Sequence, residues 1–197
     1  MSLTDAIQNA LTEAATVVTN LRADGAGVAR LAEAAERLAE VFQGDGRVLI
    51  CGNGGSACDA MHFAEEFTGR FRKDRRALSA IAIADPAHLT CTANDFGFDE
   101  VFARAIEAHA RAGDAVIVLS TSGNSANILR AIEAAGARGC VTLAFLGKAG
   151  GEARGRCDFE WIVAGETADR IQEGHMLLLH TLIECIERRL FPDLYAD

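Results

Sequence analysis

The chain has 197 residues, of which 50% are hydrophobic and 24% are charged, and its formal net charge is −9. This composition is typical of a globular protein, so we expect one domain over residues 1–197. It excludes a disordered chain, and the negative charge argues against nucleic acid as the main ligand, because phosphate backbones require clustered basic residues. The apolar runs are far shorter than the roughly 20 residues that span a bilayer, so we expect no membrane association.

The cysteines and the N-terminus indicate the cell compartment. Six cysteines form neither a Cys-x-x-Cys pair nor a zinc-finger spacing, so we expect reduced, mostly buried thiols. The first residues show no basic region followed by an apolar stretch, which is the pattern of a signal peptide. Together these features predict a cytoplasmic protein.

Apolar periodicity predicts the elements in chain order. Two amphipathic helices come first, over residues 3–22 and 28–43, with Gly25 and Gly27 between them. Five short apolar strands follow, at residues 47–51, 78–83, 115–119, 140–146 and 159–163. Helices alternate with them, over residues 56–68, about 87–110 with an interruption near 94–97, up to residue 135, and about 169–190. This alternation predicts an α/β fold, a three-layer αβα sandwich around a five-stranded parallel sheet of the flavodoxin-like kind.

Two loops rich in glycine and serine each join a strand to a helix. The first is Gly52-Asn53-Gly54-Gly55-Ser56, and the second is Ser120-Thr121-Ser122-Gly123-Asn124-Ser125. Either loop alone could be a helix cap in a tight turn, but two at equivalent positions favour a site for a phosphorylated small molecule. The first loop also matches a dinucleotide fingerprint, but the acidic residue expected about 20 residues later is missing.

Titratable side chains follow on two helices. Asp59, His62 and Glu66 share one helix face and form either a solvated stripe or a site for a metal or substrate. The last helix carries His175 and His180 among apolar residues, where a histidine is either a ligand or a satisfied core residue. A basic run over residues 70–76 is interpreted as a solvated loop.

These motifs together resemble the phosphoheptose isomerases of the sugar-isomerase (SIS) fold. The resemblance runs in order along nearly the whole chain. It rests on the first loop with His62 and Glu66, on Asn94-Asp95, on the Ser120–Ser125 loop, and on Arg170-Ile-Gln172-Glu-Gly-His-x4-His180. It implies a single SIS domain that converts sedoheptulose 7-phosphate to D-glycero-D-manno-heptose 7-phosphate through an enediol, the first step towards nucleotide-activated heptose.

The resemblance also implies roles for individual residues. Glu66 is the implied catalytic base and His180 its acid/base partner, and zinc is implied at His62, Glu66, Gln172 and His180. The implied substrate-binding residues are Asn53, Gly54, Gly55, Ser56, Glu66, Asn94, Asp95, Ser120, Thr121, Ser122, Ser125 and Gln172. Members of the family are homotetramers with sites at subunit interfaces, which fits the apolar last helix.

One geometric point leaves the zinc ligands open. Gln172 and His180 lie eight residues apart, about 12 Å along a straight helix. Both contact one ion only with extended side chains, a distorted first turn or a contribution from a second chain.

The alternative is a non-catalytic regulator of the same fold that binds the bacterial replication initiator protein. Such regulators lack the glutamate and the final histidine of the isomerases. This chain has Glu66 and His180, so the isomerase is the favoured interpretation.

Overall fold

The computed structural model describes residues 1–196, along which helices and strands alternate after two leading helices. The helices are α1 (Leu3–Ala23), α2 (Gly25–Gln43), α3 (Gly55–Thr68), α4 (Pro86–Phe96), α5 (Ala103–His109), α6 (Ala126–Ala137) and α7 (Ala168–Leu190). The strands are β1 (Val48–Gly52), β2 (Ala80–Ala82), β3 (Ala115–Ser120), β4 (Val141–Gly147) and β5 (Phe159–Val163). Short 3-10 turns lie at Phe98–Glu100, Gly151–Ala153 and Pro192–Tyr195.

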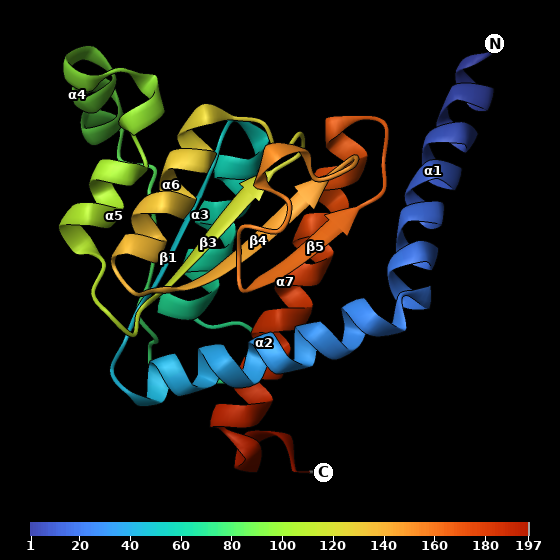
Figure 1. The fold of residues 1–197 in the computed structure, drawn as a ribbon. Coiled ribbons are helices and arrows are strands. Elements are labelled where there is room, and N and C mark those ends of the chain that lie inside the picture. The colour runs from blue at the N-terminus through green and yellow to red at the C-terminus, as the bar shows by residue number, and fades with distance from the viewer. Residues whose placement is uncertain (197) are drawn as a thin grey trace.

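The five strands form one parallel sheet in the order β2-β1-β3-β4-β5 (Figure 1). Strands β1, β3 and β4 are buried along their whole length, which explains their continuous apolar sequences. The chain leaves β1 towards one edge and β3 towards the other, so β1 and β3 form the topological switch point. Ligands of such sheets bind beyond the carboxyl ends of these strands. Both glycine and serine loops lie there.

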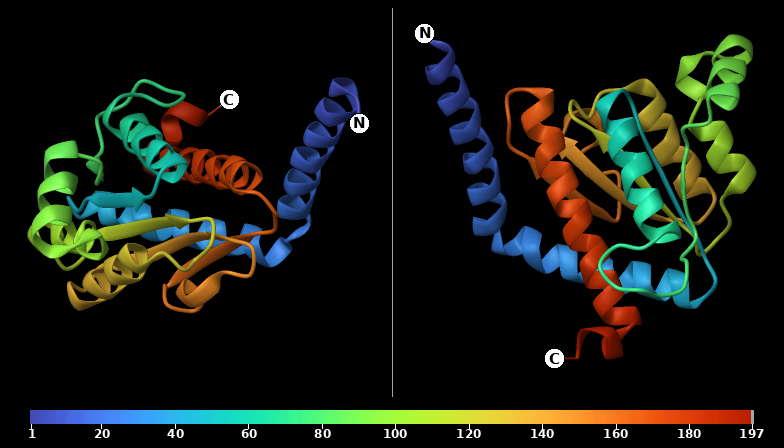
Figure 2. Two further views of the ribbon diagram at one scale, coloured as in Figure 1. Left: turned by 90° about the horizontal axis from the view of Figure 1, so that it is seen from above. Right: turned by 180° about the vertical axis from the view of Figure 1, so that it is seen from behind.

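Helices cover both faces of the sheet (Figure 2). One core lies between the sheet and α2, α3 and α7, and the other lies between the sheet and α5 and α6. Along β3, Ile117 belongs to the first core, whereas Val116 and Val118 belong to the second. Side chains alternate between the faces of a strand, so one short apolar run serves both cores. The predicted three-layer sandwich and parallel sheet are confirmed.

The leading helices meet at Asp24. The Asp24 side chain accepts a hydrogen bond from the Gly27 N–H and begins α2 at Gly25, so both glycines lie in the first turn of α2 and not between the helices. The far end of α1 projects away from the body (Figures 1 and 2). Leu3, Ile7 and Leu11 are exposed along it.

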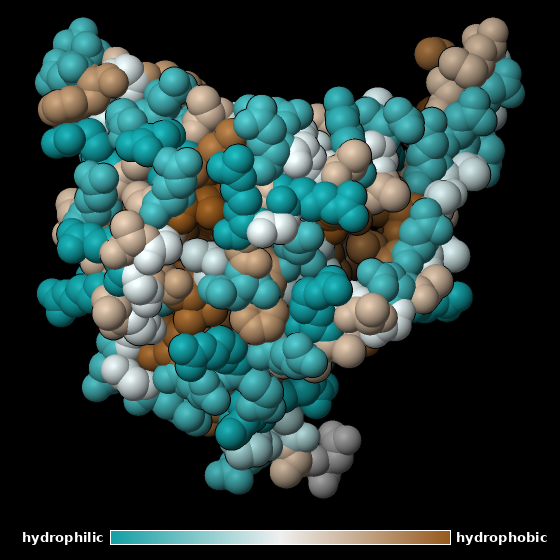
Figure 3. Space-filling view, viewed as in Figure 1, coloured by the Kyte–Doolittle hydropathy of each residue, from teal (hydrophilic) through white to brown (hydrophobic). Residues whose placement is uncertain are grey.

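The face of the molecule seen in Figure 3 is mainly hydrophilic, with apolar side chains visible in the hollow between α1 and the body. This hollow is lined by residues of α1 and of the segment that joins β5 to α7, namely Thr12, Glu13, Thr16, Val17, Ala164, Gly165, Glu166, Thr167 and Arg170. None of the helices within residues 1–196 has the length and hydropathy needed to cross a membrane.

Candidate active site

Three helix N-termini lie together at the carboxyl edge of the sheet. Helix α3 begins after β1, α6 after β3 and α7 after β5. Within residues 1–196, no side chain makes a capping hydrogen bond at any of the three. Free N–H groups and the positive ends of helix dipoles bind anions, so this edge can hold a phosphate.

The first loop brings α3 and α7 into close contact. Gly54 has a φ of +58°, which suits glycine. A Cβ atom on Gly55 would lie 2.7 Å from the amide of Gln172, so a larger residue there would displace this side chain. The Gln172 Nε2 group donates to Ser56 Oγ at 3.4 Å. Gln172 therefore lies at the N-terminus of α3, beside the predicted phosphate loop.

The second loop uses its own hydroxyls to hold its shape. Ser120 Oγ accepts a hydrogen bond from the Gly123 N–H at 3.0 Å, and Ser122 Oγ accepts from the Asn124 N–H at 3.2 Å. Gly123 has a φ of +67°, and a Cβ atom there would overlap the Gly150 carbonyl oxygen. In both serines the oxygen accepts, so the hydroxyl proton can still be donated to a ligand. Thr121 and Ser125 lie in the same loop.

The two loops are joined by a reciprocal pair of amides. Asn53 Nδ2 donates to Asn127 Oδ1, and Asn127 Nδ2 donates to Asn53 Oδ1, both at 2.9 Å. Asn127 is only 2% exposed. The side chain of Asn53, predicted to contact substrate, therefore also fixes the first loop to the start of α6.

Further along α3 and α7, three titratable side chains gather. Nε2 of His62 lies 3.3 Å from Glu66 Oε1 and 3.5 Å from His180 Nε2. The imidazole rings of His62 and His180 meet edge to face, and the ring of Phe71 also stacks on His180. His62 and Glu66 thus converge with a residue more than 100 positions away, which favours a site over a solvated stripe, although the side chain of His62 is 45% exposed.

The environment of this cluster lowers the pKa of His180. Burial lowers the pKa of His180, and the neighbouring His62 and Arg72 lower it further, while Glu66 opposes the shift. Asp59 lies one turn before His62 on α3. Burial raises the pKa of Asp59, and the charge of His62 acts to lower it. The side chain of Glu66 is 16% exposed and that of His62 is 45% exposed. The cluster thus lies at a partly open face of the α3–α7 pair.

The donor set of the cluster suits a divalent metal ion. One ligand atom from each of His62, Glu66 and His180 lies within 4.8 Å of the others. Two imidazole nitrogens and one carboxylate oxygen are ligands that zinc commonly takes, with a fourth position left over. These residues fit the predicted zinc. Gln172, the fourth predicted ligand, is held on Ser56 about two turns of α7 before His180.

Other predicted residues lie elsewhere. Asn94 and Asp95 are exposed near the end of α4, where the Asn94 side-chain amide donates to Asp95 Oδ1 at 2.6 Å. Helix α4 packs chiefly against the 3-10 turn at Phe98–Glu100, and within residues 1–196 it brings neither side chain to the cluster. His175 is fully buried beneath Leu146, whose carbonyl oxygen lies 2.9 Å from its Nε2. It is a core residue and not a member of the cluster, but it is not fully satisfied as expected, because its Nδ1 atom has no hydrogen-bond partner within residues 1–196.

Comparisons with known proteins identify the family. Residues 11–147 match the family model of the SIS domain. The chain is 56% identical over 163 residues to a phosphoheptose isomerase of Fusobacterium nucleatum, covering 83% of this chain and 84% of the relative. It is 53% identical over 187 residues to the phosphoheptose isomerase of Vibrio vulnificus, covering 94% and 98%.

The chain belongs to the phosphoheptose isomerase family. Solved structures of phosphoheptose isomerases share its fold. The protein from Neisseria gonorrhoeae superposes with a TM-score of 0.87 at 37% identity, covering 94% of this chain and 99% of that one. The protein from Francisella tularensis superposes with a TM-score of 0.89 at 30% identity, covering 95% and 100%.

The structure adds residues to the candidate site that the motifs did not indicate. Asn127 fixes the first loop, and the Arg75–Glu187 ion pair lies directly behind Glu66. In the sequence, Asn127 stands out only as a polar residue two positions after the second loop. The basic run at residues 70–76 was the only signal for Arg75, whose side chain is fully buried. The solvated-loop interpretation is therefore wrong at that position.

Proposed function

We propose that this protein is an aldose–ketose isomerase that converts sedoheptulose 7-phosphate to D-glycero-D-manno-heptose 7-phosphate. The observation that carries this proposal is a carboxylate and two imidazoles gathered on α3 and α7, the two helices whose uncapped N-termini lie at the carboxyl edge of the sheet. The names of the relatives agree with it, since both are phosphoheptose isomerases. The product would supply a pathway to nucleotide-activated heptose.

Distances along α3 match the length of the substrate. From Gly55 to His62 the helix rises by about 10 Å, and Glu66 lies one turn further on, with its side chain directed back towards the N-terminus. A linear seven-carbon chain with a terminal phosphate extends over about 10 Å, given carbon–carbon bonds of about 1.5 Å. A phosphate at the sheet edge therefore places C1 and C2 of the sugar near Glu66 and His180.

The reaction moves one proton between neighbouring carbons. The Glu66 carboxylate takes a proton from C1 of the ketose, which forms an enediol, and returns it to C2 to form the aldose. His180 gives a proton to the oxygen on C2 and removes one from the oxygen on C1. After it has given its proton to the oxygen on C2, His180 can accept the proton from the oxygen on C1, so it ends the reaction in the state in which it began.

Neutral donors hold the phosphate and the sugar hydroxyls. We assign the phosphate to the two loops and to the N-termini of α3 and α6, with Gln172 beside them. The proposed substrate-binding set is Asn53, Gly54, Gly55, Ser56, Glu66, Asn94, Asp95, Ser120, Thr121, Ser122, Ser125 and Gln172. Asn94 and Asp95 join this set only if a neighbouring subunit or a movement of α4 brings them to the sugar.

Zinc is the proposed metal, held by His62, Glu66 and His180. Gln172 completes the set if its amide leaves Ser56. When bound, such an ion supplies positive charge that polarises the carbonyl oxygen of the sugar.

A homotetramer would complete the site. Helix α1 exposes Leu3, Ile7, Leu11 and Val18, and an exposed apolar row on a projecting helix indicates a protein contact. The open side of His62 would then face a second subunit. We expect light scattering to give about four times the chain mass of 20.9 kDa, and a mass near 20.9 kDa would contradict the tetramer.

Two further predictions concern the chain as a whole. A single SIS domain over residues 1–197 is supported by β5 and α7, which lie beyond the matched segment yet pack on the same sheet. A cytoplasmic location is supported by six free cysteines, since no disulfide occurs within residues 1–196.

Solvent deuterium tests the function directly. The purified protein is incubated with sedoheptulose 7-phosphate in deuterated water, and C2 of the product is followed by NMR. We expect an aldoheptose phosphate that carries deuterium at C2, and no product from Glu66→Gln. The matched control is Glu107→Gln, an exposed glutamate on α5 outside the cluster, which should retain turnover. No turnover by the zinc-loaded wild type would refute the proposal and favour the binding-regulator alternative.

A further inference from the structure

The segment after α3, residues 69–79, lies along one face of α7. Phe71 stacks on His180 with ring centroids 5.7 Å apart. Arg72 pairs with Glu184 at 2.7 Å, and Arg75 pairs with Glu187 at 2.7 Å. Positions 180, 184 and 187 of a helix share one face. The segment therefore follows α7 from the active-site histidine to its last turns, as its path at the foot of α3 in Figure 2 shows.

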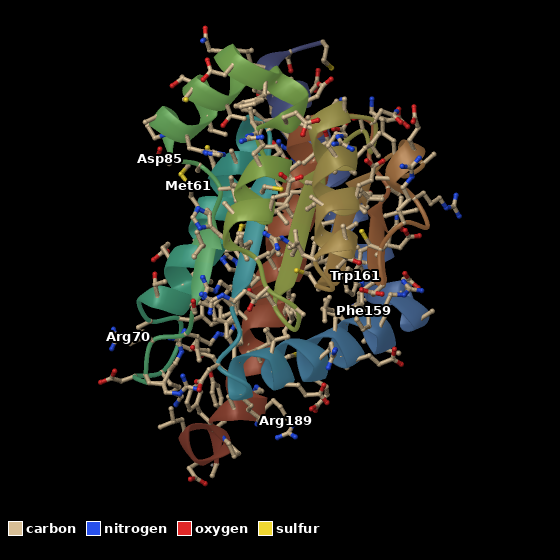
Figure 4. The ribbon with its side chains drawn as sticks, turned by 60° about the vertical axis from the view of Figure 1, so that its left-hand side comes forward. Met61, Arg70, Asp85, Phe159, Trp161 and Arg189 are labelled. Carbon is tan, nitrogen blue, oxygen red and sulfur yellow. The ribbon has the colours of Figure 1, made fainter. Side chains whose placement is uncertain are left out.

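Arg75 differs from the rest of this basic run. Its side chain is fully buried, whereas that of Arg72 is 54% exposed and Arg70 points away from the body in Figure 4. Burying a guanidinium is costly unless its charge is paired and its donors are satisfied. The structure meets both conditions, so Arg75 is an integral part of the fold and not a surface residue.

The donors of Arg75 are directed at the end of α3. Nη2 donates to the carbonyl oxygen of Glu66 at 2.6 Å, and Nη1 donates to that of Phe67 at 2.7 Å. Nη1 also lies 3.2 Å from the carbonyl oxygens of Gly69 and Arg76. The last carbonyls of a helix lack partners within the helix, and a cation at this end also complements the helix dipole. Arg75 thus caps the turn of α3 that carries Glu66.

The other side of Arg75 is fixed to α7. Its Nε donates to Glu187 Oε1 at 2.7 Å, and Glu187 is fully buried. Tyr195, in the 3-10 turn after α7, donates its hydroxyl proton to Glu187 Oε2 at 2.6 Å. Glu187 lies seven residues after His180 on the same helix. One buried ion pair therefore connects the backbone of Glu66 to the helix of His180.

We propose that Arg75, held by Glu187 and Tyr195, is a positioning residue that sets the distance between Glu66 and His180. This inference rests on the proposed isomerase function for its kinetic readout. Arg75 touches no substrate atom in this proposal. It acts through the carbonyl oxygen of Glu66, while Phe71 of the same segment supports the His180 ring.

Two variants separate positioning from simple stability. Arg75→Lys keeps a positive charge beside Glu187, but one ammonium cannot reach all the carbonyl oxygens that the planar guanidinium contacts. Arg75→Met with Glu187→Met removes both charges together, and such paired replacements of buried ion pairs often preserve the fold. The matched control is Arg76→Lys, at the neighbouring exposed position.

Kinetics and hydrogen exchange are measured on each full-length variant, with its thermal midpoint. We expect kcat to fall at least tenfold in both Arg75 variants while KM stays within twofold, because the phosphate loops are unchanged. Amides of residues 64–79 should exchange faster, and those of the sheet should not. Arg76→Lys should match the wild type. A folded Arg75→Lys protein with wild-type kcat would overturn the proposal. Changes in kcat and KM that are fully explained by a lowered thermal midpoint would also overturn it.

The design keeps the two proposals apart. A wild type that does not turn over sedoheptulose 7-phosphate refutes the function alone, and the exchange data then decide the role of Arg75. Faster exchange confined to residues 64–79 in both variants supports it. Unchanged exchange in a folded double variant refutes it.

Discussion

The amide pair between Asn53 and Asn127 gives the sharpest test of how the two loops are held together. Two N–H···O=C hydrogen bonds of 2.9 Å join them, and Asn127 is 2% exposed. A typical hydrogen bond contributes about 1 kcal/mol net, so the pair contributes about 2 kcal/mol. Asn127→Ala removes both bonds and strands the Asn53 amide. We expect it to lower the free energy of unfolding by about 2–3 kcal/mol.

A double-mutant cycle measures the coupling in the pair. Asn53→Ala, Asn127→Ala and the double variant are unfolded in urea, and their free energies of unfolding are compared with that of the wild type. The double variant should lose about as much stability as either single variant, because the bonds can be lost only once. The expected coupling energy is about 2 kcal/mol. Strictly additive losses would refute the argument, since they would mean that the two amides do not support each other.

Three further predictions follow from the structure. Burial lowers the pKa of His175 to about 4, below its usual value of 6.5, so the unfolded chain binds a proton between these values and the folded chain does not. Stability should therefore fall by up to about 3 kcal/mol as pH drops from about 6.5 to about 4. When the free energy of unfolding is measured in urea at several pH values, His175→Gln should not show this loss of stability at low pH. The same pH dependence in the variant and the wild type would contradict a lowered pKa for His175. Gly123→Ala should lower the free energy of unfolding by at least about 2 kcal/mol and raise KM, because Gly123 has a positive φ and a Cβ there would overlap the Gly150 carbonyl oxygen. Its control in thermal unfolding is Gly136→Ala, which adds a Cβ into open space. Removal of metal by a chelator should abolish turnover, and added zinc should restore it. His62→Ala should weaken zinc binding at least tenfold in a competition assay. Full activity of the metal-free protein would exclude a required ion.

The sequence alone determined the architecture and the local parts of the site. Continuous apolar runs predicted buried parallel strands, because a strand covered on both faces needs apolar side chains on both sides. Glycine and serine after β1 and β3 predicted loops at one edge of the sheet, because the carboxyl ends of parallel strands coincide. The helical spacing of His62 and Glu66 placed both on one face of α3, since neighbours four residues apart adjoin on a helix.

Only the tertiary structure decided how distant residues combine. His180 joins His62 because α3 and α7 pack side by side, and no local pattern records which of two histidines on α7 faces that way. Arg75 and Glu187 lie 112 positions apart in the chain, yet they form a buried ion pair. The sequence of a basic run does not show whether its arginines are solvated or, like Arg75, buried at the end of a helix. Local spacing fixes which face of an element a side chain occupies, whereas packing between elements decides what that face meets.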